Sequence, residues 1–249
     1  MKLSFLSFVF LVLSFTMFMS CNNDDDIDLN FPQINIMFSH FVDNEPLSFD
    51  TVIYTNAAGN KYSVSTLRYF VSNIVLTKED GSTEGFNIPH YIDATDESTF
   101  TFSSSPFPIP DGEYTSLSFV FGLTEAQNVT GAFVNPPESN MEWPVPLGGG
   151  YHYMKLEGKF DSTSTVKNYQ DHFGRLMTTP HTINITYDNL DLILVGGDEK
   201  TIECKMNVNN WWSTPNTLNL NIMSGIMQDE AIQEQLQQNG ANIFTFEVQ

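Results

Sequence analysis

Apolar residues alternate with polar ones along most of this chain, and that period of two constrains the fold more than any other feature. Successive side chains of a β-strand point to opposite faces, so the alternation predicts strands with one buried face. Clusters of Gly, Pro, Asn and Asp separate these segments, as expected for turns. The clearest alternating sets are Ile34, Ile36, Phe38 and His40; Leu117, Phe119 and Phe121; Ile183, Ile185 and Tyr187; Ile202, Cys204, Met206 and Val208; and Leu218, Leu220 and Ile222.

The remaining signals complete an all-β prediction for residues 33–249. Asp80-Gly81 is a hairpin signal, and the Pro-rich and Gly-rich stretches 103–112 and 134–150 are expected to be surface loops. Asp229 is a good N-cap for one short helix that would end at Gly240. The economical architecture is an immunoglobulin-like, antiparallel β-sandwich with a short C-terminal helix.

The N-terminus is typical of an exported lipoprotein. Lys2 precedes an apolar run over residues 3–19, which is too short and too weakly flanked for a spanning helix and indicates a signal peptide over residues 1–20. The stretch that ends in Ser20-Cys21 resembles a lipobox, which implies cleavage before Cys21 and acylation of this cysteine. The lipid would then anchor the chain to a membrane while the domain stays in water.

An acidic tether is expected over residues 21–32, because Asn22-Asn23-Asp24-Asp25-Asp26 cannot bury any apolar surface. The same run resembles the export signal that Bacteroidetes lipoproteins carry after the cysteine. That resemblance implies an outer-membrane lipoprotein displayed on the cell surface, whereas the plain tether is equally compatible with the periplasmic face.

Charge and motifs exclude several classes of function. Without Lys2 the chain keeps 30 acidic and 9 basic residues, hence a formal charge of −21, so neither nucleic acid nor an anionic bilayer is an expected partner. No G-x-S-x-G, Walker, H-E-x-x-H or paired-cysteine motif is present, and we expect no enzyme. With Cys21 lipidated, Cys204 has no disulfide partner and is expected to be a small core residue.

Three histidines stand at positions that favour metal binding. His40 ends a predicted strand, His152 opens another on the face shared by Met154 and Leu156, and His172 precedes a Phe-Gly turn. Imidazoles at strand ends can converge at one rim of a sandwich and hold copper or zinc. A hydrogen-bonded or exposed role remains the alternative for each of them.

A glycine run separates Trp143 from the His152 strand. Gly148-Gly149-Gly150 allows the backbone to approach closely, so Trp143 and His152 can meet across the loop. Simple packing of the tryptophan over a strand is the other interpretation.

Residues 141–158, which read MEWPVPLGGGYHYMKLEG, resemble the signature of the MbnP family, and particularly its Bacteroidetes branch. The similarity extends from about Gln33 to the end of the chain. Further matching pieces are Ile36-x-Phe38-x-His40-Phe41, Tyr54-Thr55-Asn56 with Gly59, residues 67–74 (LRYFVSNI), His172-Phe173-Gly174, and Asn239-Gly240-x-x-Ile243-Phe244.

The resemblance implies a β-sandwich that binds one copper ion through histidines. In methanotroph members it also implies a tryptophan oxidised to kynurenine by a partner dihaem enzyme of the peroxidase type, and Trp143 matches that position. Asn128-Val129 departs from the methanotroph pattern, which has a histidine after the asparagine. If copper binds, the thioether of Met154 or Met141 would favour Cu(I).

Two hypotheses follow from the sequence. The first is a membrane-anchored lipoprotein that binds copper for uptake or handling, with His40, His152, His172, Trp143 and Met154 at the metal site and with the dihaem enzyme or an outer-membrane receptor as partner. The second is a surface module that binds a glycan or a receptor through exposed aromatic residues. Its candidate residues are Tyr151 and either Trp211 or Trp212, since adjacent residues of an extended segment face opposite ways.

Overall fold

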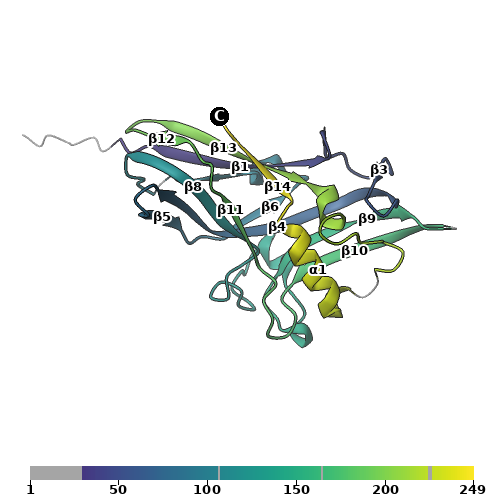
Figure 1. Cartoon of the computed structure of the whole chain (residues 1–249). Helices are drawn as coiled ribbons and strands as arrows, with labels where there is room; N and C mark the ends of the chain where they lie inside the picture. Colours follow the sequence, from purple (N-terminus) through teal and green to yellow (C-terminus); the bar gives the residue numbers. More distant parts are fainter. Residues whose placement is uncertain (1–29, 106, 164, 224–225) are drawn as a thin grey trace, which may run out of the picture.

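The computed structural model describes residues 30–249 except 106, 164, 224 and 225. The predicted signal peptide, Cys21 and most of the predicted tether therefore lie outside the described residues. The described part of the chain forms two β-sheets with one α-helix beside them (Figure 1). It contains no helix long and apolar enough to cross a membrane.

The first sheet has the strand order β14-β13-β1-β2, and β7 also pairs with β1. Ile34, Ile36 and Phe38 are fully buried, which confirms the alternation predicted for the first strand. β1 and β13 run parallel, whereas the prediction was an antiparallel sandwich. A parallel pair requires a long crossover connection, and the strands of the second sheet, which lie between β1 and β13 in the sequence, provide it. The strands are β1 (Gln33–Val42), β2 (Glu45–Pro46), β7 (Thr101–Ser103), β13 (Glu199–Asn207) and β14 (Phe244–Val248).

The second sheet is antiparallel and has the order β10-β9-β4-β8-β11, with four short strands alongside this path. The turn at Asp80-Gly81 joins β4 to β5 and confirms the predicted hairpin. The strands are β3 (Tyr54–Thr55), β4 (Lys61–Lys78), β5 (Thr83–Phe86), β6 (His90–Asp93), β8 (Gly112–Phe121), β9 (His152–Asp161), β10 (Val166–Gly174), β11 (Ile183–Tyr187) and β12 (Leu192–Leu194).

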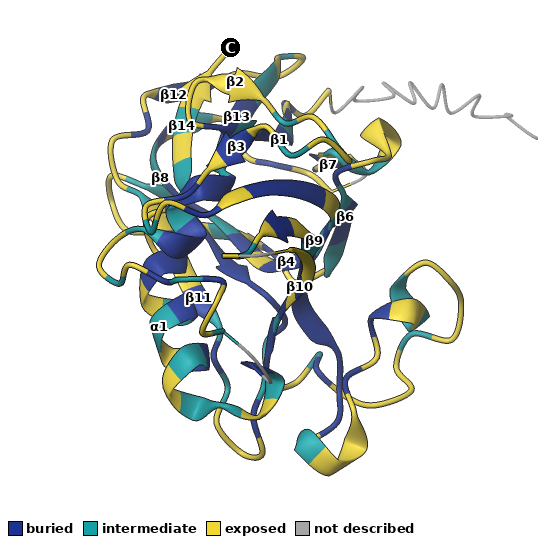
Figure 2. Ribbon diagram, turned by 90° about the vertical axis from the view of Figure 1, so that its right-hand side faces the viewer, coloured by how far each residue is buried: buried dark blue, intermediate teal, exposed yellow. Residues whose placement is uncertain are grey.

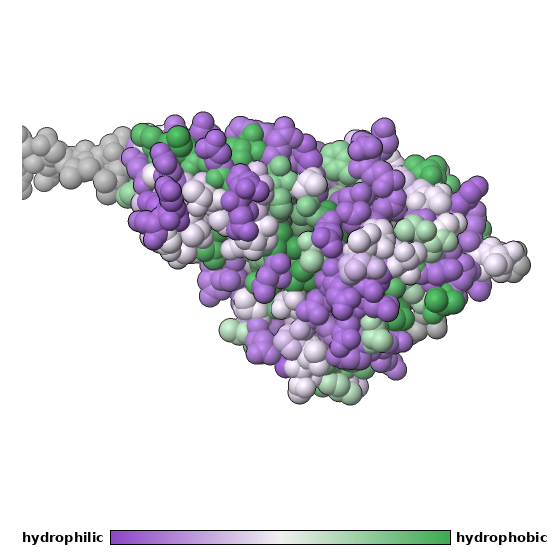
Figure 3. Space-filling view, in the orientation of Figure 1, coloured by the Kyte–Doolittle hydropathy of each residue, from purple (hydrophilic) through white to green (hydrophobic). Residues whose placement is uncertain are grey.

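The hydrophobic core lies between the two sheets. Phe38 of β1 meets Phe119 of β8 and Tyr69 of β4 edge to face, with ring centroids 5.6 and 6.4 Å apart. Cys204 is fully buried in this core, as predicted. Buried residues follow the strands while the connecting loops are exposed (Figure 2), and hydrophilic residues dominate the face seen in Figure 3. The all-β sandwich is confirmed.

The predicted C-terminal helix is present as α1 (Glu230–Gly240). Asp229 caps it by accepting a hydrogen bond from the Ile232 N–H (3.2 Å). Gln233 of α1 covers the C-terminal end of β10, because its amide donates to the His172 carbonyl (2.9 Å) and accepts from the Gly174 N–H (3.1 Å). The helix therefore closes the edge of the second sheet beside His172.

Two predictions on the C-terminal third are wrong. Leu218, Leu220 and Ile222 do not form a strand: the Leu220 N–H donates to the Asn60 side chain, and Ile222 is 78% exposed. Trp211 and Trp212 are both fully buried, because they lie in a 3₁₀ turn, η4 (Val208–Trp212), and not in an extended segment. Sequence alternation alone did not predict this change of backbone geometry.

The loop before β9 covers the outer face of the second sheet. Phe70, which points outward from β4, stacks on Phe133 of this loop (5.3 Å between centroids) and meets Tyr151 edge to face (6.4 Å). Residues 134–150 form turns, two short 3₁₀ segments and one isolated bridge, which confirms the predicted loop. The remaining 3₁₀ turns are η1 (Glu97–Thr99), η2 (Glu138–Met141), η3 (Val145–Leu147) and η5 (Ile226–Gln228).

Candidate metal centre

The glycine run brings Trp143 to the start of β9. Gly148, Gly149 and Gly150 all have positive φ (116°, 67° and 82°), a conformation that other residues rarely adopt. A Cβ atom on Gly150 would lie 2.2 Å from Oδ1 of Asn128, and this oxygen already accepts the Tyr151 N–H (2.7 Å). The loop can therefore close only with glycine there.

Closure of the loop buries Trp143 outside the main core. The Trp143 N–H donates to the Gly150 carbonyl (2.8 Å), and the indole N–H donates to the Leu147 carbonyl (3.3 Å). The indole ring packs over Gly174, where a Cβ atom would lie 3.0 Å from it. Trp143 is 1% exposed, and its ring centroid is 4.7 Å from that of His152, so the two residues meet as predicted.

A β-bulge decides which face His152 occupies. Phe173 pairs with Met154 and Gly174 pairs with His152, so Tyr153 is the extra residue of β9. The bulge reverses the alternation: Met154 stays in the core between the sheets, while His152 lies on the outer face with His172. The prediction that His152 and Met154 share a face is wrong, because the pleat does not continue through the bulge.

His152 is held as a neutral imidazole with one free nitrogen. Its Nδ1 lies 2.8 Å from the Met141 carbonyl oxygen. A carbonyl only accepts, so Nδ1 carries the proton and Nε2 carries the lone pair. Nε2 is buried and has no hydrogen-bond partner among the described residues. Burial, and then the charge of Lys155, lower the pKa of His152 to about 3, so the ring is uncharged at neutral pH.

His172 faces His152 from the edge strand. The two ring centroids are 4.8 Å apart, and the rings are nearly perpendicular (88°). His172 Nε2 lies 2.6 Å from Oε1 of Glu157, and the hydrogen bond from His172 lowers the pKa of Glu157. The carboxylate is ionised and only accepts, so Nε2 donates and Nδ1 of His172 is left for a ligand. A carboxylate behind an imidazole is the usual support of a metal-binding histidine.

His40 does not join this pair. It belongs to β1 and points between the sheets, where its Nε2 lies 3.0 Å from the Tyr69 hydroxyl and its ring is 5.0 Å from that of Phe100. Burial, only partly offset by Asp93, lowers its pKa to about 4. Among the described residues, no three His, Cys, Asp or Glu side chains are grouped so that they could hold a metal ion. The structure therefore brings together two of the three predicted histidines and Trp143.

The supporting groups of the site were not predicted. Glu157 is five residues from His152, and this odd spacing would put them on opposite faces of a regular strand. Only the bulge brings both to one face. Met141 supports His152 through its backbone carbonyl and not through the thioether considered from the sequence. Every residue has such a carbonyl, so the sequence could not predict this contact.

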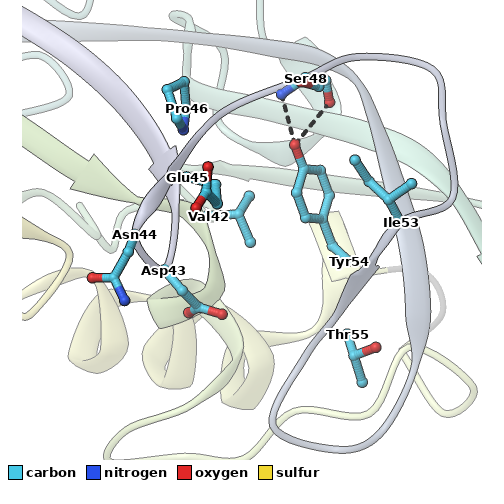
Figure 4. Close-up of a pocket in the computed structure, with 9 residues that line it drawn as sticks. All are labelled: Val42, Asp43, Asn44, Glu45, Pro46, Ser48, Ile53, Tyr54 and Thr55. Carbon is cyan, nitrogen blue, oxygen red and sulfur yellow. Dashed lines mark hydrogen bonds between the residues drawn. The ribbon is translucent and has the colours of Figure 1, made fainter.

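A separate hollow lies at the turn between β1 and β2 (Figure 4). Its volume is about 750 Å³, and none of His152, His172 and Trp143 lines it. Figure 4 shows the Tyr54 ring beside Ser48, whose N–H donates to the Tyr54 hydroxyl (2.6 Å). Asp43 and Glu45 also line this hollow.

The fold and the site together define a class of protein: an all-β sandwich with a candidate metal centre of two histidines and a buried tryptophan on its outer face. A family model, MbnP, matches residues 32–228, and the chain therefore belongs to the MbnP family. Membership of this family supports a copper-related function. A search of curated proteins gave no match.

A solved structure agrees with the family assignment. MbnP from Methylosinus trichosporium superposes on this chain with a TM-score of 0.55 and 12% sequence identity, over 87% of this chain and 98% of that one. At this identity the likeness shows the shared fold. The resemblance to MbnP predicted from the sequence is confirmed, while membership of a Bacteroidetes branch stays a prediction.

Proposed function

We propose that this protein binds one copper ion between Nε2 of His152 and Nδ1 of His172, with Trp143 beside the metal. The observation that carries the proposal is the buried, unpartnered Nε2 of His152, whose lone pair is kept by the hydrogen bond between Nδ1 and the Met141 carbonyl. An unsatisfied buried nitrogen costs free energy unless it has a ligand. Copper would relieve that cost.

The donor set fits copper. Metal–nitrogen bonds to histidine are about 2 Å long, so two imidazoles whose centroids are 4.8 Å apart can share one ion. Imidazole suits both copper and zinc, and copper stands above zinc in the affinity order of divalent ions. When bound, copper would supply a redox-active ion next to Trp143. Glu157 would orient His172, and the Met141 carbonyl would orient His152.

Copper titration of the purified protein tests the assignment. The wild type should take up close to one equivalent of Cu(II), which thioethers do not select, and His152→Ala or His172→Ala should lose it. His40→Gln is the control, because His40 lies between the sheets and should leave the stoichiometry unchanged. Unchanged copper affinity in His152→Ala would refute the site, and loss in His40→Gln alone would return the ligand role to His40.

We also propose that the protein acts in copper uptake or handling as a lipoprotein of the outer membrane, anchored through Cys21. The expectation of a dihaem oxidant or an outer-membrane receptor as partner belongs to the same proposal. Trp143 is suitably placed for oxidation, since its ring centroid is 4.7 Å from that of His152. A mass change confined to the peptide that carries Trp143, in protein from its native cells, would support this modification. An unmodified Trp143 in copper-loaded native protein would contradict it.

A non-metal binding module remains the second candidate, at a different place from the one predicted. Tyr151, Trp211 and Trp212 are each at most 1% exposed and form no surface platform, which overturns the aromatic site expected from the sequence. The hollow of Figure 4, which Asp43, Glu45 and Tyr54 line, is the place that we propose for such a ligand instead. Binding of a glycan that survives His152→Ala and is lost in Asp43→Ala would support this candidate.

A further inference from the structure

A second hollow borders the strand that carries His172. β10 is the edge strand of the second sheet, and Gln233 covers only its end at His172 and Gly174. Beside the rest of this edge, residues 168–172 face Met223 and residues 226–228 across a hollow of about 390 Å³. His172 lines this hollow and also faces His152, so the hollow adjoins the candidate metal centre.

Asp171, which lines this hollow, has a buried carboxylate that is paired with no cation among the described residues. Asp171 is 2% exposed, and among the described residues its carboxylate accepts one hydrogen bond, from the indole N–H of Trp212 to Oδ2 (2.7 Å). None of the ion pairs among the described residues includes Asp171. A buried carboxylate is costly unless it is paired, so a positive ion in the hollow would be stabilising.

Two thioethers identify the kind of cation. Met223 and Met227 are both half-buried and line the same hollow as Asp171. Thioether sulfur is a soft ligand that selects Cu(I), whereas calcium and magnesium require oxygen ligands. A carboxylate and two thioethers in one hollow therefore match a soft, singly charged metal ion.

We propose that this hollow is an entry site for Cu(I), held by the thioethers of Met223 and Met227 and balanced in charge by Asp171. From there the ion would exchange its sulfur ligands for the imidazoles of His172 and His152. The entry role rests on the function proposed above, whereas Cu(I) binding at the hollow stands on these residues alone.

X-ray absorption spectroscopy of the full chain, loaded anaerobically with Cu(I) alone, tests this site. At two equivalents the wild type should show sulfur scattering in addition to nitrogen. The double variant Met223→Leu/Met227→Leu should lose the sulfur signal, retain one equivalent, and load that equivalent more slowly. Leucine conserves the volume of methionine, so the fold should survive the change. Met37→Leu on β1 is the matched control and should behave as the wild type.

Two results would overturn the entry site: no sulfur scattering in the wild type at two equivalents, or two equivalents retained by the double variant. Sulfur scattering that remains in the double variant counts against it as well. The two proposals fail separately. Loss of the nitrogen-bound equivalent in His152→Ala tests the histidine centre, while the sulfur-bound equivalent should persist in that variant.

Discussion

Each histidine of the candidate centre uses a different ring nitrogen for its hydrogen bond to the protein. His152 donates from Nδ1 to a backbone carbonyl and His172 donates from Nε2 to Glu157, so each ring has one nitrogen left. The two rings meet edge to face. His40 gives Nε2 to Tyr69, and its unpartnered Nδ1 is buried among aromatic rings of the core. Only His152 and His172 lie beside another imidazole, so only these two can share a metal ion. His40 is isolated in the core.

Glu157→Gln should weaken copper binding without removing it. The amide can still accept from His172, but it no longer carries the negative charge that makes the imidazole a better donor. Loss of such a supporting carboxylate typically lowers metal affinity about 10–100-fold. Competition against a copper chelator measures this change. Glu203→Gln, which alters a carboxylate bonded to Ser39 on the first sheet, is the control; equal affinities in the two variants would contradict the role of Glu157.

Asp171→Asn should stabilise the metal-free protein at neutral and higher pH. Burial raises the pKa of Asp171 to about 7 from its ordinary 3.8. Below pH 3.8 the group is protonated in both the folded and the unfolded state, so it adds no cost. Between pH 3.8 and about 7 only the unfolded state ionises, and the cost to folding grows until both states are ionised. The difference corresponds to at most about 4 kcal/mol.

Denaturant unfolding at several pH values checks this prediction. The variant should exceed the wild type in free energy of unfolding at pH 8 and match it near pH 4. Asparagine can still accept the indole N–H of Trp212, so the hydrogen bond itself is preserved. A variant that is less stable than the wild type at pH 8 would show that the ionised carboxylate is compensated in the metal-free protein.

Among the elements of the fold, the loop before β9 contributes most to the site. Gly150→Ala should disrupt it, because the added Cβ atom would lie 2.2 Å from the Asn128 side chain at φ = 82°. The positive φ alone costs about 1–2 kcal/mol for alanine, and the clash adds to this. Trp143 and the start of β9 should then shift, with loss of copper binding.

Gly81→Ala is the matched control for the loop. Gly81 has a similar φ of 83°, but its added Cβ atom would meet nothing within 4 Å. It should therefore lower the free energy of unfolding by about 1–2 kcal/mol and leave copper affinity unchanged. Unfolding and copper titration of both variants make the comparison; if they lose equal stability and bind copper equally, the loop does not set the site.

Regular strands were predictable from the sequence and irregular ones were not. The alternation of apolar residues correctly predicted the buried face of β1, because the strand is regular along its whole length. At His152 the same reasoning failed, since one extra residue at Tyr153 moves the histidine to the other face. The pairing of Trp143 with His152 was predicted from the glycine run, whereas Glu157 required the observed register.

For the whole molecule, attachment to a membrane through Cys21 is part of the proposed function. The chain has a formal net charge of −20, and its described part contains no membrane-spanning helix. The predicted lipid on Cys21 would supply the anchor, because acyl chains contribute about 0.8 kcal/mol for each buried methylene.

Cys21→Ser should therefore release the protein from the membrane fraction of the cells that produce it. Fractionation of these cells, followed by mass spectrometry of the N-terminal peptide, measures both the location and the acylation. The wild type should begin with an acylated Cys21. Equal membrane association of the wild type and the variant would contradict the lipid anchor.

The proposed function depends on one copper ion held between His152 and His172. A crystal structure of the copper-loaded protein, with anomalous data collected at the copper absorption edge, tests it most directly. We expect an anomalous peak between Nε2 of His152 and Nδ1 of His172, next to the Trp143 ring. A loaded crystal with no peak there, or with its main peak at His40, would contradict the account.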